Sequence, residues 1–168
     1  MPDTDDSMRS LLLPLEDSNL LLPETIVAEV VDYTTPKGSR DAEQPHWLLG
    51  LVPWRGQHLP CVALEALNGL PVADAGSRAR TVVLKAVGGR AGMPYVAVRT
   101  RSIPRLVNVH RRALEPVEEA EGQGPVVRQA VLAEGEPALI PDLDYIEAQT
   151  HRALFDWQPA ENPFEQAY

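Results

Sequence analysis

The chain has 168 residues, of which 44% are hydrophobic, and this is enough to build the core of one domain. Its 24 acidic residues outnumber 15 Lys and Arg residues, and the net charge of −9 opposes binding to a phosphate backbone. The single cysteine, Cys61, excludes an internal disulfide and indicates a reducing compartment. No apolar run approaches the ~20 residues of a membrane-spanning helix. We therefore expect a cytoplasmic protein without direct membrane insertion.

Charge is distributed unevenly along the chain. Residues 78–112 contain nine basic and no acidic residues, whereas residues 1–50 and 115–168 are strongly acidic. A basic block can indicate nucleic-acid binding, but this one offers only Tyr95 as a stacking aromatic. We interpret the block as the solvated outer faces of strands, and we expect no nucleic-acid partner.

The N-terminal third favours short strands and turns. Sixteen prolines and eleven glycines interrupt the chain too often for long helices. Residues 1–10 are expected to form a disordered leader, and residues 11–22 an apolar hairpin with a polar turn. Residues 24–31 fit either a strand or a short helix, because their apolar positions have helical spacing but four are β-branched. Residues 34–46 are a polar loop.

Residues 47–64 predict a second hairpin, in which two apolar strands meet at residues 55–57. Gly56 can take the positive φ that a tight hairpin turn needs. Arg55, beside it, has two interpretations. It is either a surface arginine whose stem packs on Trp54 or a charge presented to a protein partner, since Arg and Trp are frequent at interface hot spots. Trp54 itself is expected in the core or at its edge.

Further short elements follow the second hairpin. Residues 65–69 predict a helical turn closed by a glycine in the left-handed conformation. Residues 81–87 and 93–101 predict two strands, with Gly88-Gly89 as a two-residue hairpin signal between them. Residues 103–109 are expected to form one more strand.

The C-terminal third begins with residues 115–125, which are expected to form an acidic, flexible loop. A hairpin is predicted over residues 130–140. Asp142 and Asp144 then suit the first turn of a final helix, as a cap and as a charge. Residues 156–168 are expected to be a flexible tail with acidic and aromatic residues.

No catalytic or metal-binding pattern is evident. The four histidines are far apart, and the serines lie in no nucleophile motif. We therefore expect no enzymatic activity, no cofactor and no metal. Two alternatives stay open: a small-ligand-binding β-barrel module, which would need an apolar cavity, and an enzyme of unrecognised type, which would need clustered ionisable groups.

The order "hairpin, loop, hairpin, short helix" occurs twice, at an offset of about seventy to eighty residues. The repeat predicts two small β-units that pack side by side because neither buries a core well alone. Chance similarity among apolar hairpins is the alternative.

Residues 47–64 also resemble the signature of the CheW family of bacterial chemosensory adaptors. The signature positions are filled by Gly50, Arg55, Gly56, Pro60, Val62 and Leu64. Residues 24–30 and 138–144 are similar to two further elements of the family, and the resemblance covers about residues 11–150. It implies an all-β fold, a CheW-like pair of five-stranded β-barrels with a few short helices, in a domain expected over residues 11–155.

The resemblance further implies a non-enzymatic adaptor that couples the cytoplasmic domain of chemoreceptors to a CheA-like histidine kinase, at receptor arrays on the membrane. The partner-binding residues expected from it are Val27, Glu29 and Arg55, to which we add Trp54 and Gly56 beside the arginine. Pro53-Trp54 replaces a more usual Asn-Leu pair, which suits the divergent CheW-like proteins of pilus-linked twitching systems, such as ChpC.

Overall fold

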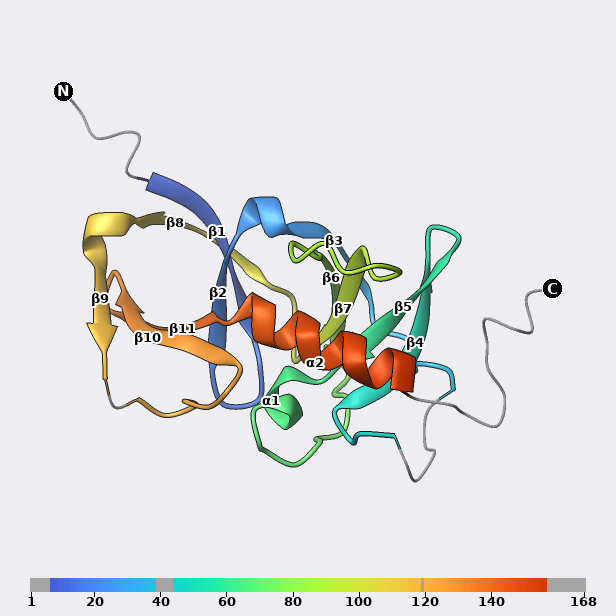
Figure 1. The fold of residues 1–168 in the computed structure, drawn as a ribbon. Coiled ribbons are helices and arrows are strands. Elements are labelled where there is room, and N and C mark those ends of the chain that lie inside the picture. The colour runs from blue at the N-terminus through green and yellow to red at the C-terminus, as the bar shows by residue number, and fades with distance from the viewer. Residues whose placement is uncertain (1–6, 39–43, 119, 157–168) are drawn as a thin grey trace.

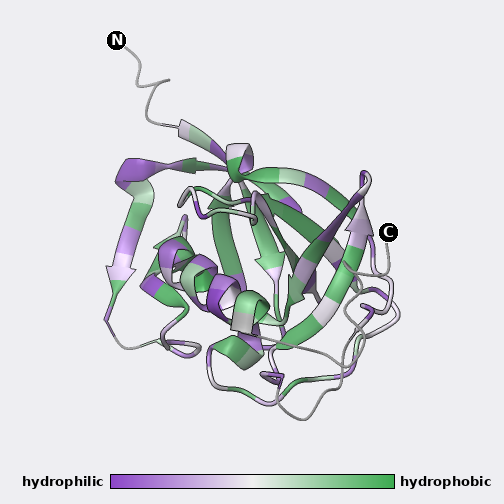
Figure 2. Ribbon diagram, turned by 45° about the vertical axis from the view of Figure 1, so that its right-hand side comes forward, coloured by the Kyte–Doolittle hydropathy of each residue, from purple (hydrophilic) through white to green (hydrophobic). Residues whose placement is uncertain are grey.

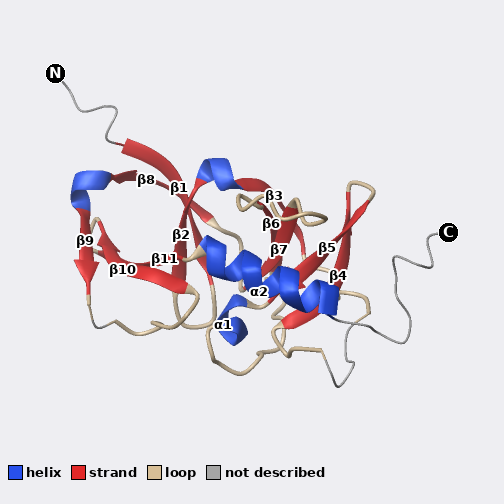
Figure 3. Ribbon diagram, in the orientation of Figure 1, coloured by secondary structure: helices blue, strands red, loops and turns tan. Residues whose placement is uncertain are grey.

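The computed structural model of the chain describes residues 7–38, 44–118 and 120–156. In chain order the strands are β1 (Ser7–Pro14), β2 (Asn19–Pro23), β3 (Val27–Asp32), β4 (Leu48–Trp54), β5 (Gln57–Val62), β6 (Arg80–Lys85), β7 (Tyr95–Thr100), β8 (Arg105–His110), β9 (Leu114–Val117), β10 (Val127–Ala133) and β11 (Glu136–Pro141). The α-helices are α1 (Leu64–Leu67) and α2 (Leu143–Asp156). Two 3-10 turns, η2 (Glu24–Ile26) and η3 (Arg111–Ala113), precede β3 and β9. Strands therefore dominate the molecule, as Figure 3 shows, and the expected all-β class is confirmed.

The strands form two sheets that lie side by side (Figure 1). The first has six strands in the order β8-β1-β2-β11-β10-β9, and the second has five in the order β3-β6-β7-β5-β4. The ladders between described residues leave both sheets open, so the two expected barrels are curved sheets rather than closed cylinders. Without β9, which extends the first sheet by one strand, both sheets would have five strands.

The two sheets have the same internal order, but each combines one hairpin from each half of the predicted repeat, so the sequence units do not correspond to the sheets. In each sheet a hairpin that precedes a helix, β10-β11 or β4-β5, joins a second hairpin, β1-β2 or β6-β7. The junction is the parallel pair of its sheet: Leu20 faces Leu139 in the first, and Cys61 faces Ala97 in the second. All other strand pairs are antiparallel.

The core has a central cluster between the sheets, one cluster within each sheet, and a small fourth cluster between β4 and α2. Alternate residues of a strand enter different clusters: Leu13 lies in the central one, and Leu12 lies in the cluster formed only by strands of the first sheet. In the second sheet Val82 is central, whereas Val83 lies in the cluster formed only by strands of that sheet. Because both faces of these strands are buried, their sequences are continuous apolar runs rather than alternating ones.

Helix α2 lies across the two sheets in Figure 1 and has hydrophilic and hydrophobic residues along its length in Figure 2. Asp142 Oδ1 accepts a hydrogen bond from the backbone N–H of Tyr145 at 3.0 Å, which confirms the predicted cap. Ile146 enters the central core, and Ala153 packs with Leu48 and Leu51 of β4. The helix thus joins both sheets through its apolar residues.

Several boundaries differ from the expectations. Strand β1 begins at Ser7, within the expected leader, because β8 pairs with it up to the Ser7–His110 position. The ambiguous segment is the 3-10 turn η2 followed by strand β3. The expected flexible loop at 115–125 is wrong at its start, where β9 pairs with β10. The expected leader at 1–6 and tail at 157–168 lie outside the described residues.

The prediction of a two-residue hairpin at Gly88-Gly89 is also wrong. Strand β6 ends at Lys85 and β7 begins at Tyr95, so the connection is longer. The backbone N–H groups of Val87 and Gly88 donate to the two carboxylate oxygens of Glu147 in α2, at 2.8 and 2.7 Å. These backbone N–H groups therefore donate to a side chain of α2 and not to a facing strand, as they would in a tight hairpin.

Arg99 is an exception to the interpretation of the basic block as solvated strand faces. It is only 8% exposed. Its Nη2 donates to the backbone oxygen of Ala73 at 2.6 Å, and its guanidinium lies 5.9 Å from the centre of the Tyr33 ring. These partners offset part of the cost of burying the charge. Among the described helices, none is long and apolar enough to cross a membrane.

Candidate functional site

The tip of the β4–β5 hairpin is a two-residue turn. Trp54 pairs with Gln57, so Arg55 and Gly56 alone make the bend. Their φ angles are +47° and +75°, as a type I′ turn requires at both central positions. The twist of this turn matches that of the strands, which places the arginine at the outermost point of the hairpin.

The first glycine of the hairpin, Gly50, has a different role. Its φ is +136°, and a Cβ atom there would lie 2.6 Å from the backbone oxygen of Lys37. The same backbone exchanges hydrogen bonds with Leu51, since Lys37 N–H donates to Leu51 O and Leu51 N–H to Lys37 O, both at 2.8 Å. Gly50 therefore lets the backbone at Lys37 lie against β4.

Glu29, Trp54 and Arg55 form one cluster at the hairpin tip. A single carboxylate oxygen, Glu29 Oε1, accepts from Trp54 Nε1 at 2.9 Å and from Arg55 Nη2 at 3.1 Å. The guanidinium carbon of Arg55 also lies 4.7 Å from the centre of the Trp54 ring. The three side chains thus orient one another, and the charge of Arg55 is held at a defined place.

Trp54 is the buried member of the cluster. Trp54 is 8% exposed and packs edge-on against Tyr95, with ring centres 4.8 Å apart. Trp54 therefore lies in the core, as expected, while its indole N–H reaches the surface acid. A buried tryptophan with a satisfied N–H is a rigid platform for the two charged groups.

Strand β3 presents Glu29 through a β-bulge. Val27 pairs with Leu84 and Glu29 with Val83, so Ala28 is the additional residue. Val27 packs against the central core, whereas Glu29 bonds to residues of the β4–β5 hairpin. The structure therefore brings Glu29, Trp54, Arg55 and Gly56 together, but it places the Val27 side chain in a different environment.

The charged pair is open to solvent. The side chains of Arg55 and Glu29 are 66% and 39% exposed. An exposed ion pair contributes about 0–1 kcal/mol to stability, so a carboxylate from a partner can displace Glu29 from Arg55 at small cost. Arg55 packs over Trp54 and keeps its charge exposed, an arrangement that both interpretations expect, and its role in partner binding stays a prediction.

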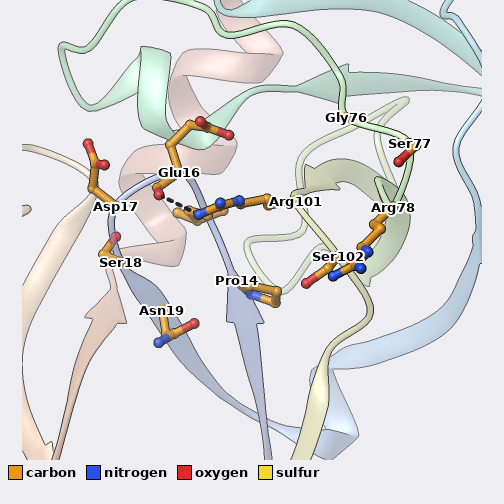
Figure 4. Close-up of a pocket in the computed structure, with 11 residues that line it drawn as sticks. Pro14, Glu16, Asp17, Ser18, Asn19, Gly76, Ser77, Arg78, Arg101 and Ser102 are labelled. Carbon is orange, nitrogen blue, oxygen red and sulfur yellow. Dashed lines mark hydrogen bonds between the residues drawn. The ribbon is translucent and has the colours of Figure 1, made fainter.

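Two cavities flank the turn between β1 and β2, and no motif in the sequence indicates either of them. A cavity of about 570 Å³ contains Arg78 and Arg101, as Figure 4 shows. A second cavity of about 330 Å³ lies between this turn, α1 and residues 121–127, and is lined by Glu65. Periodicity could identify α1 but not its buried acid, since a glutamate in a short helix normally faces solvent.

Glu65 is 6% exposed, and burial raises the pKa of its carboxyl above the ordinary value of 4.5. Its Oε2 accepts from the backbone N–H of Glu16 at 3.3 Å, and Oε1 has no hydrogen-bond partner among the described residues. Cys61 is fully buried, and burial raises the pKa of its thiol to about 12. Within the described ranges, no group of three or more His, Cys, Asp or Glu side chains could hold a metal ion.

Comparison with known proteins gives a family and a fold. Residues 9–149 match the CheW-like domain family. Among solved structures, the scaffolding protein TtCheW from Thermoanaerobacter tengcongensis superposes with a TM-score of 0.65 at 15% identity, over 80% of this chain and 88% of that one. A search of curated proteins finds no match.

Proposed function

The chain belongs to the CheW-like domain family, and on that premise we propose that it is a non-enzymatic adaptor. It couples the cytoplasmic domain of a chemoreceptor to a CheA-like histidine kinase through protein–protein contacts. The functional unit is the domain over residues 11–155. It acts at receptor arrays on the membrane, and its partners recruit it to these arrays from the cytoplasm.

One observation carries the proposal: the cluster of Glu29, Trp54 and Arg55 at the tip of the β4–β5 hairpin. The arginine that fills the family signature is held over a buried tryptophan, yet most of its side chain is exposed. Arg and Trp are frequent in interface hot spots, and a preoriented charge loses little conformational freedom on binding. We assign the partner-binding role to Glu29, Trp54, Arg55 and Gly56, with Val27 beside them on β3.

The test compares two arginines in similar ion pairs. Arg55 lies 3.1 Å from Glu29, and Arg9 lies 3.1 Å from Glu24, with arginine side chains 66% and 64% exposed. Arg55→Ala should weaken binding to the kinase or to the receptor domain by about 1–3 kcal/mol, whereas Arg9→Ala should leave both affinities unchanged. Calorimetric titration of the purified partners measures the difference.

Both substitutions should lower the free energy of unfolding by no more than about 1 kcal/mol, which thermal melts can check. If Arg55→Ala leaves both affinities at the wild-type value, or weakens them no more than Arg9→Ala does, the adaptor proposal loses its binding residue.

We propose further that the kinase and receptor belong to a pilus-linked twitching system, as for ChpC-type proteins. The support is Trp54, which stands directly before the arginine and shares Glu29 Oε1 with it. Affinities measured side by side for the kinase of a pilus system and for that of a flagellar system test this assignment. A preference for the flagellar kinase would contradict it.

A further inference from the structure

Two cavities share one wall, the turn between β1 and β2. Leu15, Asp17 and Ser18 line both. This turn lies beside α1, whereas the Arg55 hairpin tip projects from another part of the molecule (Figure 1). The pair of cavities is therefore separate from the cluster around Arg55.

The smaller cavity suits an apolar stem that ends in a cation. Its walls are largely aliphatic, with Leu20, Leu64 and Leu139 among them. Its charged lining residues are Asp17, Glu65 and Glu121, all acidic. A lysine side chain, which has four methylene groups and one compact charge, matches both properties.

Glu65 gives this cavity a specific requirement. A carboxyl group that is 6% exposed and has one oxygen without a hydrogen-bond partner is costly unless a cation or donor joins it. The terminal torsion of a glutamate is soft, so this oxygen can turn toward a ligand in the cavity. A bound ammonium group would offset the desolvation of the carboxylate.

The larger cavity is lined by two arginines, Arg78 and Arg101, together with Glu16 and Asp17. Neither Arg78 nor Arg101 forms an ion pair with a described acidic residue, although the chain is acidic overall. Arg101 Nη1 donates to the backbone oxygen of Glu16 at 3.2 Å, while the carboxylates of Glu16 and Asp17 point away from both guanidinium groups (Figure 4). Two guanidinium groups without carboxylate partners suit an acidic side chain.

We propose that the two cavities form one docking surface for a peptide segment of a protein partner. The segment crosses the β1–β2 turn, places a lysine side chain against Glu65, and places an acidic side chain on Arg78 and Arg101. The ligand is assigned to a protein because it needs a cation and an anion on one chain. A free alkylamine would fill one cavity and leave the arginines of the other without a ligand.

The test uses capped peptides with one lysine and one glutamate separated by one to three alanines. They are titrated into the isotope-labelled full chain and followed by the NMR signals of its backbone amides. We expect saturable shifts in α1 and near Arg101 for at least one spacing. Glu65→Gln should weaken that peptide about tenfold, and Arg101→Gln about fivefold.

The peptide side provides controls that leave the protein unchanged. With norleucine in place of lysine, binding should weaken and lose its sensitivity to Glu65→Gln. With glutamine in place of glutamate, it should lose its sensitivity to Arg101→Gln. Glu134→Gln, in the exposed β10–β11 turn, should leave the affinity for the peptide unchanged.

Three results would overturn the proposal. The first is the absence of saturable binding at every spacing. The second is equal affinity for the lysine and norleucine peptides. The third is n-pentylamine binding as tightly as the best peptide with no effect of Arg101→Gln, which would indicate a site for free amines instead.

Discussion

Two adjacent residues with positive φ determine the shape of the hairpin tip. Arg55 adopts +47° and Gly56 +75°, and only the glycine does so without a steric penalty. The arginine accepts some backbone strain at the position where its charge is most exposed. Strain of this kind is frequent at binding sites, where the surrounding structure holds the residue in place.

Gly56→Val should lower the free energy of unfolding by about 2 kcal/mol, because a β-branched residue is strained at this φ. A Cβ atom at Gly56 would meet no atom within 4 Å, so the cost comes from the backbone alone. Gly76→Ala is the matched control: its surroundings are equally open and its φ is not positive, so stability should be unchanged or slightly higher. Urea denaturation of both variants measures this, and equal stabilities would contradict the turn assignment.

Glu65 should make stability depend on pH. Its pKa is raised by burial, so the folded state binds more protons than the unfolded state above the ordinary value of 4.5. The free energy of unfolding then falls as the pH rises from 4.5 through the folded-state pKa. In Glu65→Gln this contribution is absent. The free energy of unfolding of the variant should therefore increase relative to that of the wild type as the pH rises. Thermal melts across this range would contradict the assignment if the two curves stayed parallel.

At the scale of elements, helix α2 organises the long connection between β6 and β7. Glu147 is 3% exposed and accepts from Val87 and Gly88, while its Oε1 lies 3.4 Å from Arg90 Nη1. Arg90 Nη2 also pairs with Asp144 at 3.0 Å. A loop with many glycines thus gains a defined conformation from one buried carboxylate.

Glu147→Gln should destabilise the protein by about 1–3 kcal/mol, because an amide replaces one acceptor oxygen with a donor, so that one of the two backbone N–H groups loses its acceptor and faces a donor instead. Asp144→Asn, on the same helix and paired with the same arginine, is the control. Its side chain is 81% exposed, so its loss should cost about 0–1 kcal/mol. Denaturant titration separates the two, and hydrogen exchange should be faster at Val87 and Gly88 in the Glu147 variant alone.

At the scale of the whole molecule, the chain leaves the first sheet once and later returns to it. It begins in the first sheet, forms all five strands of the second, and returns to complete the first. The central cluster contains side chains from both, including Leu13 and Leu20 from one and Val82 and Val98 from the other. Neither sheet therefore has a complete core without the other.

The shared core predicts cooperative unfolding. Far-ultraviolet circular dichroism, which reports on both sheets, and tryptophan fluorescence should show coincident transitions. Leu13→Ala, at a fully buried central position, should lower stability by about 3–5 kcal/mol and should speed hydrogen exchange in β6 as well as in β1. Protection that persists in the second sheet after the first has opened would show two independent units.

The sequence by itself determined the elements whose causes are local. Apolar runs and turn residues predicted the β1–β2, β4–β5 and β10–β11 hairpins, because a tight turn depends on a few neighbouring residues. Helix α2 was predicted from a cap that acts within one turn. The positive φ of Gly56 belongs to the same class of local pattern.

Only the tertiary structure decided which distant segments meet. Strand β1 pairs with β8, and β9 forms within an acidic stretch because β10 offers it a free edge. Arg99 is buried although the basic block of residues 78–112 is expected on the solvated faces of strands. Glu29 reaches Trp54 and Arg55, which lie 25 and 26 residues away, and Glu65 lines a cavity with residues 121–127. These contacts depend on how two curved sheets pack around one core, and composition, periodicity and spacing contain no measure of that packing.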